Sequence, residues 1–258
     1  MAIPLRKPQE IAKLKAAGEI VGNTLQYLQN IIKPGMTLQE IDTLGEKYIR
    51  EQGAEPSFKG LYGFTGSVCT SLNDVCIHGV PDDTVVKEGD ILGLDIGTKL
   101  DGYYGDAAIT MPIGEVSKDD LELIACSKDA LYHAIESIKV GMRFKELTKI
   151  LEDFITDRGY VPLRNYCGHG IGTKPHDEPS IPNYLEGKPK QGPKIKNGMV
   201  FCLEPMICQK SGEAVLLEDE WSVVSEDNLR TSHYEHQVAV VDGKAVILTN
   251  PTNIEQGN

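Results

Sequence analysis

Five residues of the types that bind metal ions occur in two similar parts of the chain, at positions that could face one cavity. They are Asp95, Asp106, His169, Glu204 and Glu235. Carboxylates and one imidazole form a moderately hard donor set, which suits divalent Mn, Fe, Co or Zn better than a structural zinc site built on thiolates. Two such ions about 4 Å apart can share a water, lower its pKa and polarise a bound carbonyl. The set therefore predicts a paired-metal hydrolase of peptides or esters.

The first two acids are expected on one face of a β-hairpin. Asp95 lies near the end of the apolar run 90–96, and the Asp-Gly pair at 101–102 signals a two-residue turn. Such a turn places Gly97 opposite Asp106, and the alternation of side chains puts Asp95 on the same face. Diagonal neighbours lie roughly 7 Å apart, close enough to reach one pair of ions. A three-residue loop would break this arrangement, and a lone aspartate is more often an ordinary strand-end residue.

Hydrophobic periodicity predicts the helices that must support this hairpin. Apolar residues at three- and four-residue steps indicate a helix over about residues 9–32, with Pro8 in its first turn. Thr37 and Glu40 form a capping-box signal for a second helix, which ends near Gly53. The chain thus begins with two helices before its first strands.

The same order of elements returns later in the chain. Ser117 opens a helical pattern equivalent to the first helix, and residues 32–56 match residues 138–162 at an offset of 106. We therefore expect one domain over the whole chain, built from two duplicated halves at about residues 8–112 and 117–250.

The duplication also relates the acids of the two halves. A strand segment that ends at Asp95 matches one that ends at Glu204, at an offset of 109, and Asp106 is expected to correspond to Glu235. Paired helices followed by strands predict an α+β fold. In this fold, helices lie outside a strongly curved, mostly antiparallel sheet, and two pseudo-symmetric halves close around the metal pair.

Composition excludes several classes of function. The chain has 258 residues, 40% of them hydrophobic, so it can bury a substantial core. A net charge of -12 argues against a specific nucleic-acid site. The six scattered cysteines suit a reducing cytoplasm, and no apolar stretch is long enough to predict a signal peptide or a membrane span.

Three more histidines, His78, His176 and His236, accompany the five candidate ligands in the sequence. A hydrolase needs such groups around its metals, although a single histidine is more often a satisfied polar residue than a catalyst. The glycines in residues 168–172 allow backbone to approach a ligand closely, and the alternative is a simple flexible turn.

Several stretches together resemble one known family. They are Cys76-Ile77-His78-Gly79-Val80-Pro81, Gly105-Asp106, Gly168-His169-Gly170-Ile171-Gly172, His176-Asp177-Glu178-Pro179, Glu204-Pro205 and Tyr234-Glu235-His236. With Asp95, they make the chain resemble the type I methionine aminopeptidases from about residue 8 to 250. All five ligand types stand in the family's order and spacing.

The resemblance implies the pita-bread fold and a metal-dependent aminopeptidase. Such an enzyme removes the initiator methionine from nascent proteins when the second residue is small, by attack of a hydroxide that bridges two divalent ions (Co, Mn, Fe or Zn). Asp95 and Asp106 would bind one ion, and Asp106, His169, Glu204 and Glu235 would complete the pair.

The resemblance also implies catalytic roles for three residues. Glu204 would carry the proton, His176 would stabilise the tetrahedral oxyanion, and His78 would hold the scissile amide near its nitrogen. His78 and His176 would therefore also contact substrate. The methionine side chain would enter an apolar pocket, for which ordinary core is the alternative interpretation: Phe58, Leu61, Phe64, Cys69 and Trp221.

Two positions depart from the family pattern, because Leu61 stands where an aromatic residue is common and Pro175 where a bulky apolar residue is common. The chain lacks the N-terminal zinc segment of some eukaryotic relatives and the long insertion of the type II group. A bacterial-style, cytoplasmic monomer is expected, with nascent N-termini as partners, contact with the ribosome surface, and no membrane. The sequence starts with Met1 and Ala2, so removal of its own Met1 is also expected.

Two alternatives remain open from the sequence. A proline-directed aminopeptidase or prolidase of the same fold would share the five ligands, although such enzymes usually carry a preceding domain. A non-catalytic pita-bread binding protein would commonly have lost ligands, whereas all five types are present here.

Overall fold

The structure is a computed structural model that describes residues 3–252. In the first half the elements are α1 Pro8–Ile31, α2 Leu38–Glu51, β1 Glu55–Pro56, the 3-10 helix η1 Leu61–Gly63, β2 Val68–Leu72, β3 Val75–Ile77, β4 Ile91–Leu100 and β5 Tyr103–Pro112. In the second half they are α3 Lys118–Ser137, α4 Phe144–Thr156, β6 Val161–Pro162, β7 Cys167–Gly170, β8 Asp177–Pro182, β9 Val200–Leu203, β10 Met206–Cys208, β11 Ala214–Leu216, β12 Val223–Ser225, β13 Thr231–His233, β14 His236–Val241 and β15 Lys244–Ile247. No helix within the described residues is long and apolar enough to cross a membrane.

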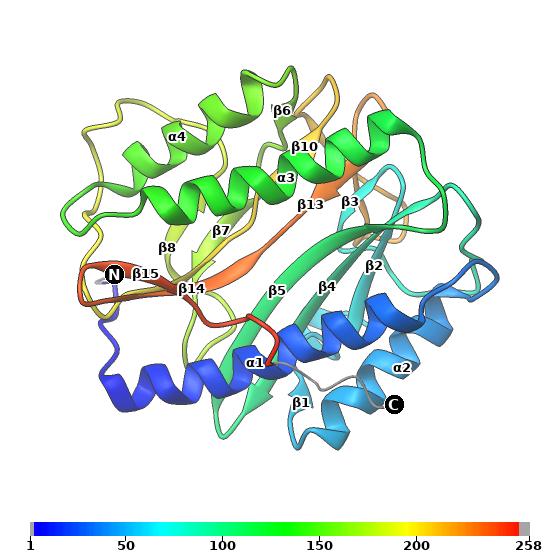
Figure 1. Ribbon diagram of the computed structural model, residues 1–258, viewed down its shortest axis with the longest axis horizontal. Helices are drawn as coiled ribbons and strands as arrows, with labels where there is room; N and C mark the ends of the chain where they lie inside the picture. The colour runs from blue at the N-terminus through cyan, green and yellow to red at the C-terminus, as the bar shows by residue number, and fades with distance from the viewer. Residues whose placement is uncertain (1–2, 253–258) are drawn as a thin grey trace.

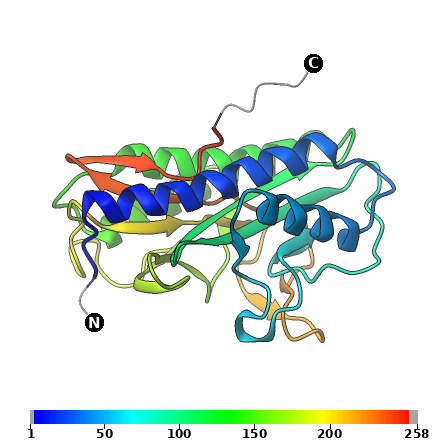
Figure 2. The same cartoon turned by 90° about the horizontal axis from the view of Figure 1, so that it is seen from below.

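The helices cover one side of a curved layer of strands. Helices α1 and α3 lie over the middle of this layer, with α2 and α4 towards its outer edges (Figure 1). On the other side, the loops that contain η1 and that follow β11 project next to each other (Figure 2). Every strand pair in the described residues is antiparallel. The predicted α+β fold, with helices outside a mostly antiparallel sheet, is confirmed.

Two sheets carry the elements that matter for the site. In one, β4 pairs with β5 along one edge, and β2 and the short β1 pair with successive residues along its other edge. In the other, the strand order is β15-β14-β9-β7-β8. Each half has its own apolar cluster beneath its helices, and the ring of Tyr234 packs against both clusters. Burial of these faces is the main source of stability for a chain of this size.

The helix starts follow the capping signals in the sequence. Helix α1 begins at Pro8, as expected for a residue with a fixed φ and no N–H. At α2 the Glu40 N–H donates to Thr37 Oγ1 at 3.1 Å, and the Thr37 N–H donates to Glu40 Oε2 at 2.8 Å. In α3 the Asp120 N–H donates to the Ser117 hydroxyl at 3.1 Å. These predicted boundaries are confirmed within two residues.

The β4–β5 hairpin has the predicted register. Asp101 and Gly102 have φ values of 48° and 80°, the left-handed pair that a two-residue turn of type I′ requires. Gly97 therefore lies opposite Asp106, and Asp95 lies opposite Ala108. The two aspartates are diagonal neighbours on one face, as the sequence predicted.

The proposed correspondence between Asp106 and Glu235 is wrong. In the second half His236 pairs with Leu203. Because the strands are antiparallel, the next residues along them, Glu235 and Glu204, lie opposite each other. Glu235 thus occupies the position that Ala108 has opposite Asp95 in the first half. Ala108 and Glu235 also face each other across the junction, where each backbone N–H donates to the other's carbonyl, at 3.4 and 2.8 Å. The pairing register, which the sequence match did not resolve, decides this relation.

Candidate metal centre

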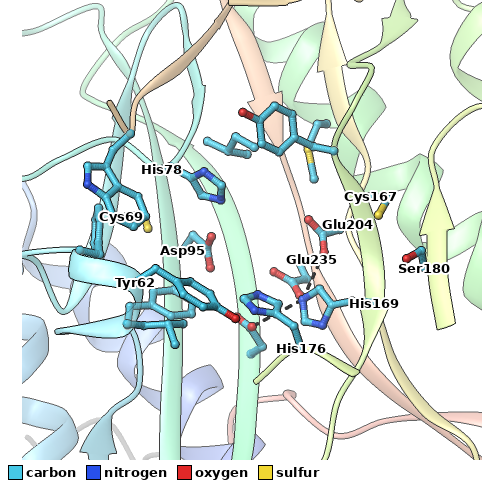
Figure 3. Close-up of a pocket in the computed structure, with 18 of the residues that line it drawn as sticks. Tyr62, Cys69, His78, Asp95, Cys167, His169, His176, Ser180, Glu204 and Glu235 are labelled. Carbon is cyan, nitrogen blue, oxygen red and sulfur yellow. Dashed lines mark ion pairs between the residues drawn. The ribbon is translucent and has the colours of Figure 1, made fainter. Parts of the chain in front are cut away.

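All five candidate ligands line one cavity of about 580 Å³, and Figure 3 shows Asp95, His169, Glu204 and Glu235 pointing into it. Asp95 and Asp106 come from β4 and β5, and His169 comes from β7. Glu204 directly follows β9, and Glu235 directly precedes β14. We call these five residues the central cluster. Two sheets, one from each half, therefore supply its side chains.

His169 lies between the acids of this cluster. Its Nε2 is 3.5 Å from Glu204 Oε1 and 3.9 Å from Asp106 Oδ2. Its Nδ1 lies 3.0 Å from the Gly170 carbonyl oxygen, which can only accept a hydrogen bond. Nδ1 therefore carries the proton, and the Nε2 lone pair faces the carboxylates. This is the orientation in which histidines usually bind metals.

The acids of the central cluster are buried and poorly satisfied. Asp106, Glu204 and Glu235 are 4%, 8% and 2% exposed. Within residues 3–252, Asp95 Oδ1, Asp106 Oδ1 and Glu235 Oε1 have no hydrogen-bond partner. Burial, and secondly the neighbouring acids, raise the pKa of Asp106, Glu204 and Glu235, and burial raises that of Asp95. Like charges without partners are costly in such a site.

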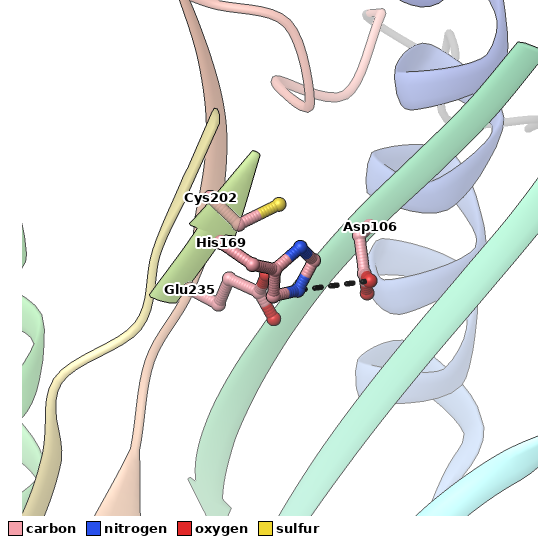
Figure 4. A group of neighbouring side chains, drawn as sticks. All are labelled: Asp106, His169, Cys202 and Glu235. Carbon is pink, nitrogen blue, oxygen red and sulfur yellow. Dashed lines mark ion pairs between the residues drawn. The ribbon is translucent and has the colours of Figure 1, made fainter. Parts of the chain in front are cut away.

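These orphaned oxygens fit a divalent cation. Four carboxylates and one imidazole are the donors that first-row divalent metals accept, and a positive ion would satisfy the unpaired oxygens directly. Three of the ligand atoms, on Asp106, His169 and Glu235, already lie within 4.8 Å of one another (Figure 4). The central cluster thus suits a divalent cation in donor type, burial and proximity.

His78 and His176 line the same cavity. The ring of His176 packs edge-on against His169, with centroids 4.5 Å apart. His78 directly follows β3 with a φ of 58°, an uncommon backbone conformation that often marks functional sites, and its ring packs edge-on against Tyr166. Burial lowers the pKa of His78 to about 4 and also lowers that of His176. Both rings are therefore neutral near pH 7, each with one N–H to donate.

Another part of the cavity lining is apolar. Phe58, Phe64 and Cys69 are buried, and Leu61 and Trp221 pack against them. The Phe64 and Trp221 rings meet edge to face, with centroids 5.1 Å apart. All five predicted pocket residues line the cavity that also contains the central cluster.

Other sequence predictions had different outcomes. His236 does not line the cavity, because its ring nitrogens bond the Tyr132 and Thr249 hydroxyls at 3.0 and 2.8 Å. The glycine loop mainly allows neighbouring strands to approach, since a Cβ on Gly170 would stand 2.0 Å from the Glu178 carbonyl oxygen. His236 and this glycine thus serve the framework around the site.

Two residues near the site were missed. Tyr62 is 78% exposed at the cavity mouth, and its ring stacks on His176 with centroids 6.3 Å apart. Cys202 lies beside the central cluster. Strand alternation from Glu204 could have found Cys202, whereas no pattern in the sequence marks Tyr62.

The N-terminal segment supports the His176 loop. Arg6 Nη2 donates to Asp177 Oδ2 at 3.2 Å, and the Arg6 N–H donates to the Gly198 carbonyl oxygen at 2.6 Å. A Cβ on Gly172 would stand 1.9 Å from Arg6 Nη2, so the guanidinium fills the space beside this glycine. The loop that presents His176 is thus held by a residue that lies 171 positions before its partner Asp177 in the sequence.

Comparisons with known proteins agree with this fold. Residues 12–241 match the family model of metallopeptidase family M24, and the chain belongs to that family. Proteins of this family use divalent metal ions for hydrolysis, and the fold is its pita-bread fold. A methionine aminopeptidase of Helicobacter pylori is 60% identical over 251 residues, which are 96% of this chain and 99% of that protein.

Solved structures give the same assignment of fold. The crystal structure of methionine aminopeptidase from Rickettsia prowazekii matches with a TM-score of 0.93 and 32% identity, over 96% of this chain and 100% of that one. The prolidase from Pyrococcus furiosus matches with a TM-score of 0.77 and 23% identity, over 96% of this chain and 66% of that one. The prolidase likeness concerns the fold alone.

Proposed function

We propose that the protein is a methionine aminopeptidase, which hydrolyses the first peptide bond of a polypeptide that begins with methionine followed by a small residue. The observation that carries the proposal is one cavity with two chemically different parts. The central cluster and the apolar group of Phe58, Phe64 and Cys69 line it side by side. The names of the similar proteins from Helicobacter pylori and Rickettsia prowazekii support this activity.

The central cluster would hold two divalent cations, with Asp95 and Asp106 on one and His169, Glu204 and Glu235 completing the pair. When bound, Mn, Fe, Co or Zn ions would polarise the substrate carbonyl and lower the pKa of a water. The unpaired carboxylate oxygens support this ligand set, because they need a positive partner.

The remaining groups would orient the substrate and move protons. Glu204 would take a proton from the attacking water and deliver it to the amine that leaves. His176 would donate its N–H to the carbonyl oxygen as negative charge develops there, and His78 would hold the scissile amide nitrogen. Their lowered pKa values support neutral imidazoles in these roles at pH 7.

The apolar part of the cavity would take the methionine side chain. Phe58, Phe64 and Trp221 offer aromatic surface, which suits a polarizable thioether. Leu61 would leave more room than an aromatic residue at that position. Cys69 completes the pocket as a small buried group with a strongly raised thiol pKa, caused first by burial, so it is not a nucleophile.

We also propose that the substrates are nascent chains in the cytoplasm and that the enzyme acts there as a monomer near the ribosome surface. Only a newly made chain presents an unprocessed initiator methionine. The six free cysteines of the described residues suit a reducing compartment. Met1 itself lies outside the described residues, and intact-mass measurement of the purified protein tests its removal.

A peptide panel tests the main proposal. The chelated enzyme is reloaded separately with Mn, Fe, Co and Zn and given Met-Xaa-Ser peptides, with Leu-Ala-Ser as a control for the pocket. We expect release of methionine from Met-Ala-Ser and Met-Gly-Ser, little from Met-Leu-Ser, and none without added metal. Full activity after chelation would overturn the proposal.

The prolidase alternative is tested in the same experiment. Adding Ala-Pro and Ala-Pro-Ser to the panel measures proline-directed activity. Hydrolysis of these peptides without cleavage of Met-Ala-Ser would assign the chain to the proline-directed group. Absence of any hydrolysis with all four metals would favour the non-catalytic binding protein.

A further inference from the structure

Cys202 is a sixth potential ligand at the metal centre. It lies on β9 two residues before Glu204, so strand alternation puts both side chains on the same face. Its sulfur lies within 4.8 Å of a ligand atom on each of Asp106, His169 and Glu235 (Figure 4). The residue is completely buried, so these groups, and not solvent, surround it.

The simpler interpretation of Cys202 is a small core residue. It does contact an apolar group of side chains that includes Val200 and Ala239. A core role, however, does not require the sulfur to lie among two acids and an imidazole, which offer little apolar contact. Since thiols are also metal ligands, this position has chemical significance beyond packing.

Distances around a zinc ion explain what the sulfur could do. Zinc binds nitrogen and oxygen at about 2.1 Å and sulfur at about 2.3 Å, so neighbouring ligand atoms stand roughly 3.5 Å apart in a tetrahedral site. The four atoms here all lie within 4.8 Å of one another. Side-chain shifts of about 1 Å would therefore bring all four onto one ion.

We propose that Cys202 supplies a sulfur donor to one cation of this centre, together with Asp106, His169 and Glu235, when that cation is thiophilic, such as Zn²⁺ or Cd²⁺. On coordination the sulfur–metal bond forms, the S–H bond breaks, and the proton leaves to solvent. The proposal rests on the metal site of the proposed function and extends its ligand set.

The chemical consequence is a difference between soft and hard metals. Four protein ligands complete a tetrahedral site, whereas catalytic zinc sites keep one position open. A cation held by all four ligands would therefore bind more tightly and support slower hydrolysis, less so for Zn²⁺ than for the softer Cd²⁺, while Mn²⁺, which prefers oxygen ligands, would leave the sulfur unbound and the site open. The chain would be active with the harder metals and poisoned by Cd²⁺.

X-ray absorption of the full-length protein tests the proposal directly. Metal-free protein is loaded with one equivalent of Zn²⁺, and the zinc edge is measured for wild type, Cys202→Ser and Cys126→Ser. Cys126 is a buried thiol on α3, away from the central cluster, and serves as the matched control. We expect a sulfur neighbour at about 2.3 Å in wild type and Cys126→Ser, and only nitrogen and oxygen in Cys202→Ser.

Metal affinity gives a second readout. By competition with a chelating dye, Cys202→Ser should bind Cd²⁺ at least about tenfold more weakly than wild type, and Mn²⁺ within about twofold. A wild-type zinc spectrum without sulfur would overturn the proposal even if the variant failed to fold. Neither measurement uses a peptide, so failure of the proposed peptidase activity would be seen separately.

Discussion

The histidines of this protein differ in what their surroundings allow them to do. His169 donates from Nδ1 to a backbone carbonyl, which leaves its other nitrogen for a metal ion. His176 packs against His169 and is not one of the five candidate ligands. Both are neutral at pH 7, because burial lowers their pKa. One ring is therefore suited to bind a cation, and the other to donate a hydrogen bond.

Replacement of His176 should separate catalysis from metal binding. If His176 stabilises the oxyanion, His176→Ala should lower kcat for Met-Ala-Ser by about 10²- to 10³-fold, the usual effect of losing one such donor. The bound metal per chain should stay at the wild-type value, as measured by mass spectrometry of the metal. Loss of metal in parallel with activity would instead make His176 a ligand.

His236 should make the protein sensitive to acid. Burial lowers its folded-state pKa to about 4, whereas an unfolded histidine has a pKa of about 6.5. At a pH between these two values, His236 is protonated in the unfolded chain and neutral in the folded chain. The free energy of unfolding should therefore fall as the pH falls from 6.5 towards 4, by up to about 1.4 kcal/mol per pH unit from this residue.

The variant His236→Gln isolates this contribution. Urea unfolding of both chelated proteins between pH 8 and pH 4.5 gives the difference in stability at each pH. We expect wild type to lose stability relative to the variant below pH 6.5, because glutamine does not titrate. The four acids of the central cluster titrate in both proteins and cancel. A constant difference across this range would contradict the assigned burial effect.

At the scale of elements, local signals predicted regular structure well. The capping pair Thr37 and Glu40 and the turn at 101–102 act within a few residues, so the sequence contains their whole cause. The relation between Asp106 and Glu235 depends on how distant strands pair, which alternation alone does not fix. The contact between Arg6 and Asp177 likewise needed the folded chain.

The Arg6 contact should support the His176 loop. Arg6→Ala removes a partly buried, charge-assisted hydrogen bond and opens space beside Gly172. We expect a loss of about 1–3 kcal/mol in stability and a several-fold lower kcat, while KM changes less. Lys7→Ala, at the neighbouring exposed position, is the control and should stay within about 0.5 kcal/mol. Wild-type kcat and stability in Arg6→Ala would show that the loop with His176 keeps its conformation without Arg6.

At the scale of the molecule, the central cluster joins the two halves. The first half supplies Asp95 and Asp106, and the second supplies the other three side chains. The sequence predicted these five as ligands from donor type and family resemblance, and the duplication related only Asp95 to Glu204 correctly. It could not give their distances or the unpaired oxygens, because these depend on the curvature of both sheets. The single domain over residues 1–258 stays a prediction.

Metal binding should stabilise both halves together. A cation that binds only the folded chain adds about 2.7 kcal/mol at a concentration of one hundred times Kd. In calorimetry we expect one transition that moves to higher temperature with Mn²⁺ and returns on chelation. Glu235→Ala should reduce this shift, whereas Glu226→Ala, an acid away from the cluster, should preserve it. Two transitions, with only one moved by metal, would show that the halves unfold independently.

The mutual backbone hydrogen bonds of Ala108 and Glu235 have a practical consequence. They attach Glu235, an acid of the second half, to the strand that carries Asp106. The candidate ligands are divided between the two halves, so neither half contains the whole set. If the gene were divided in the connection at residues 113–117, each polypeptide would carry an incomplete ligand set. High-affinity cation uptake would then report that the two fragments had reassembled, which offers a ready basis for a split reporter.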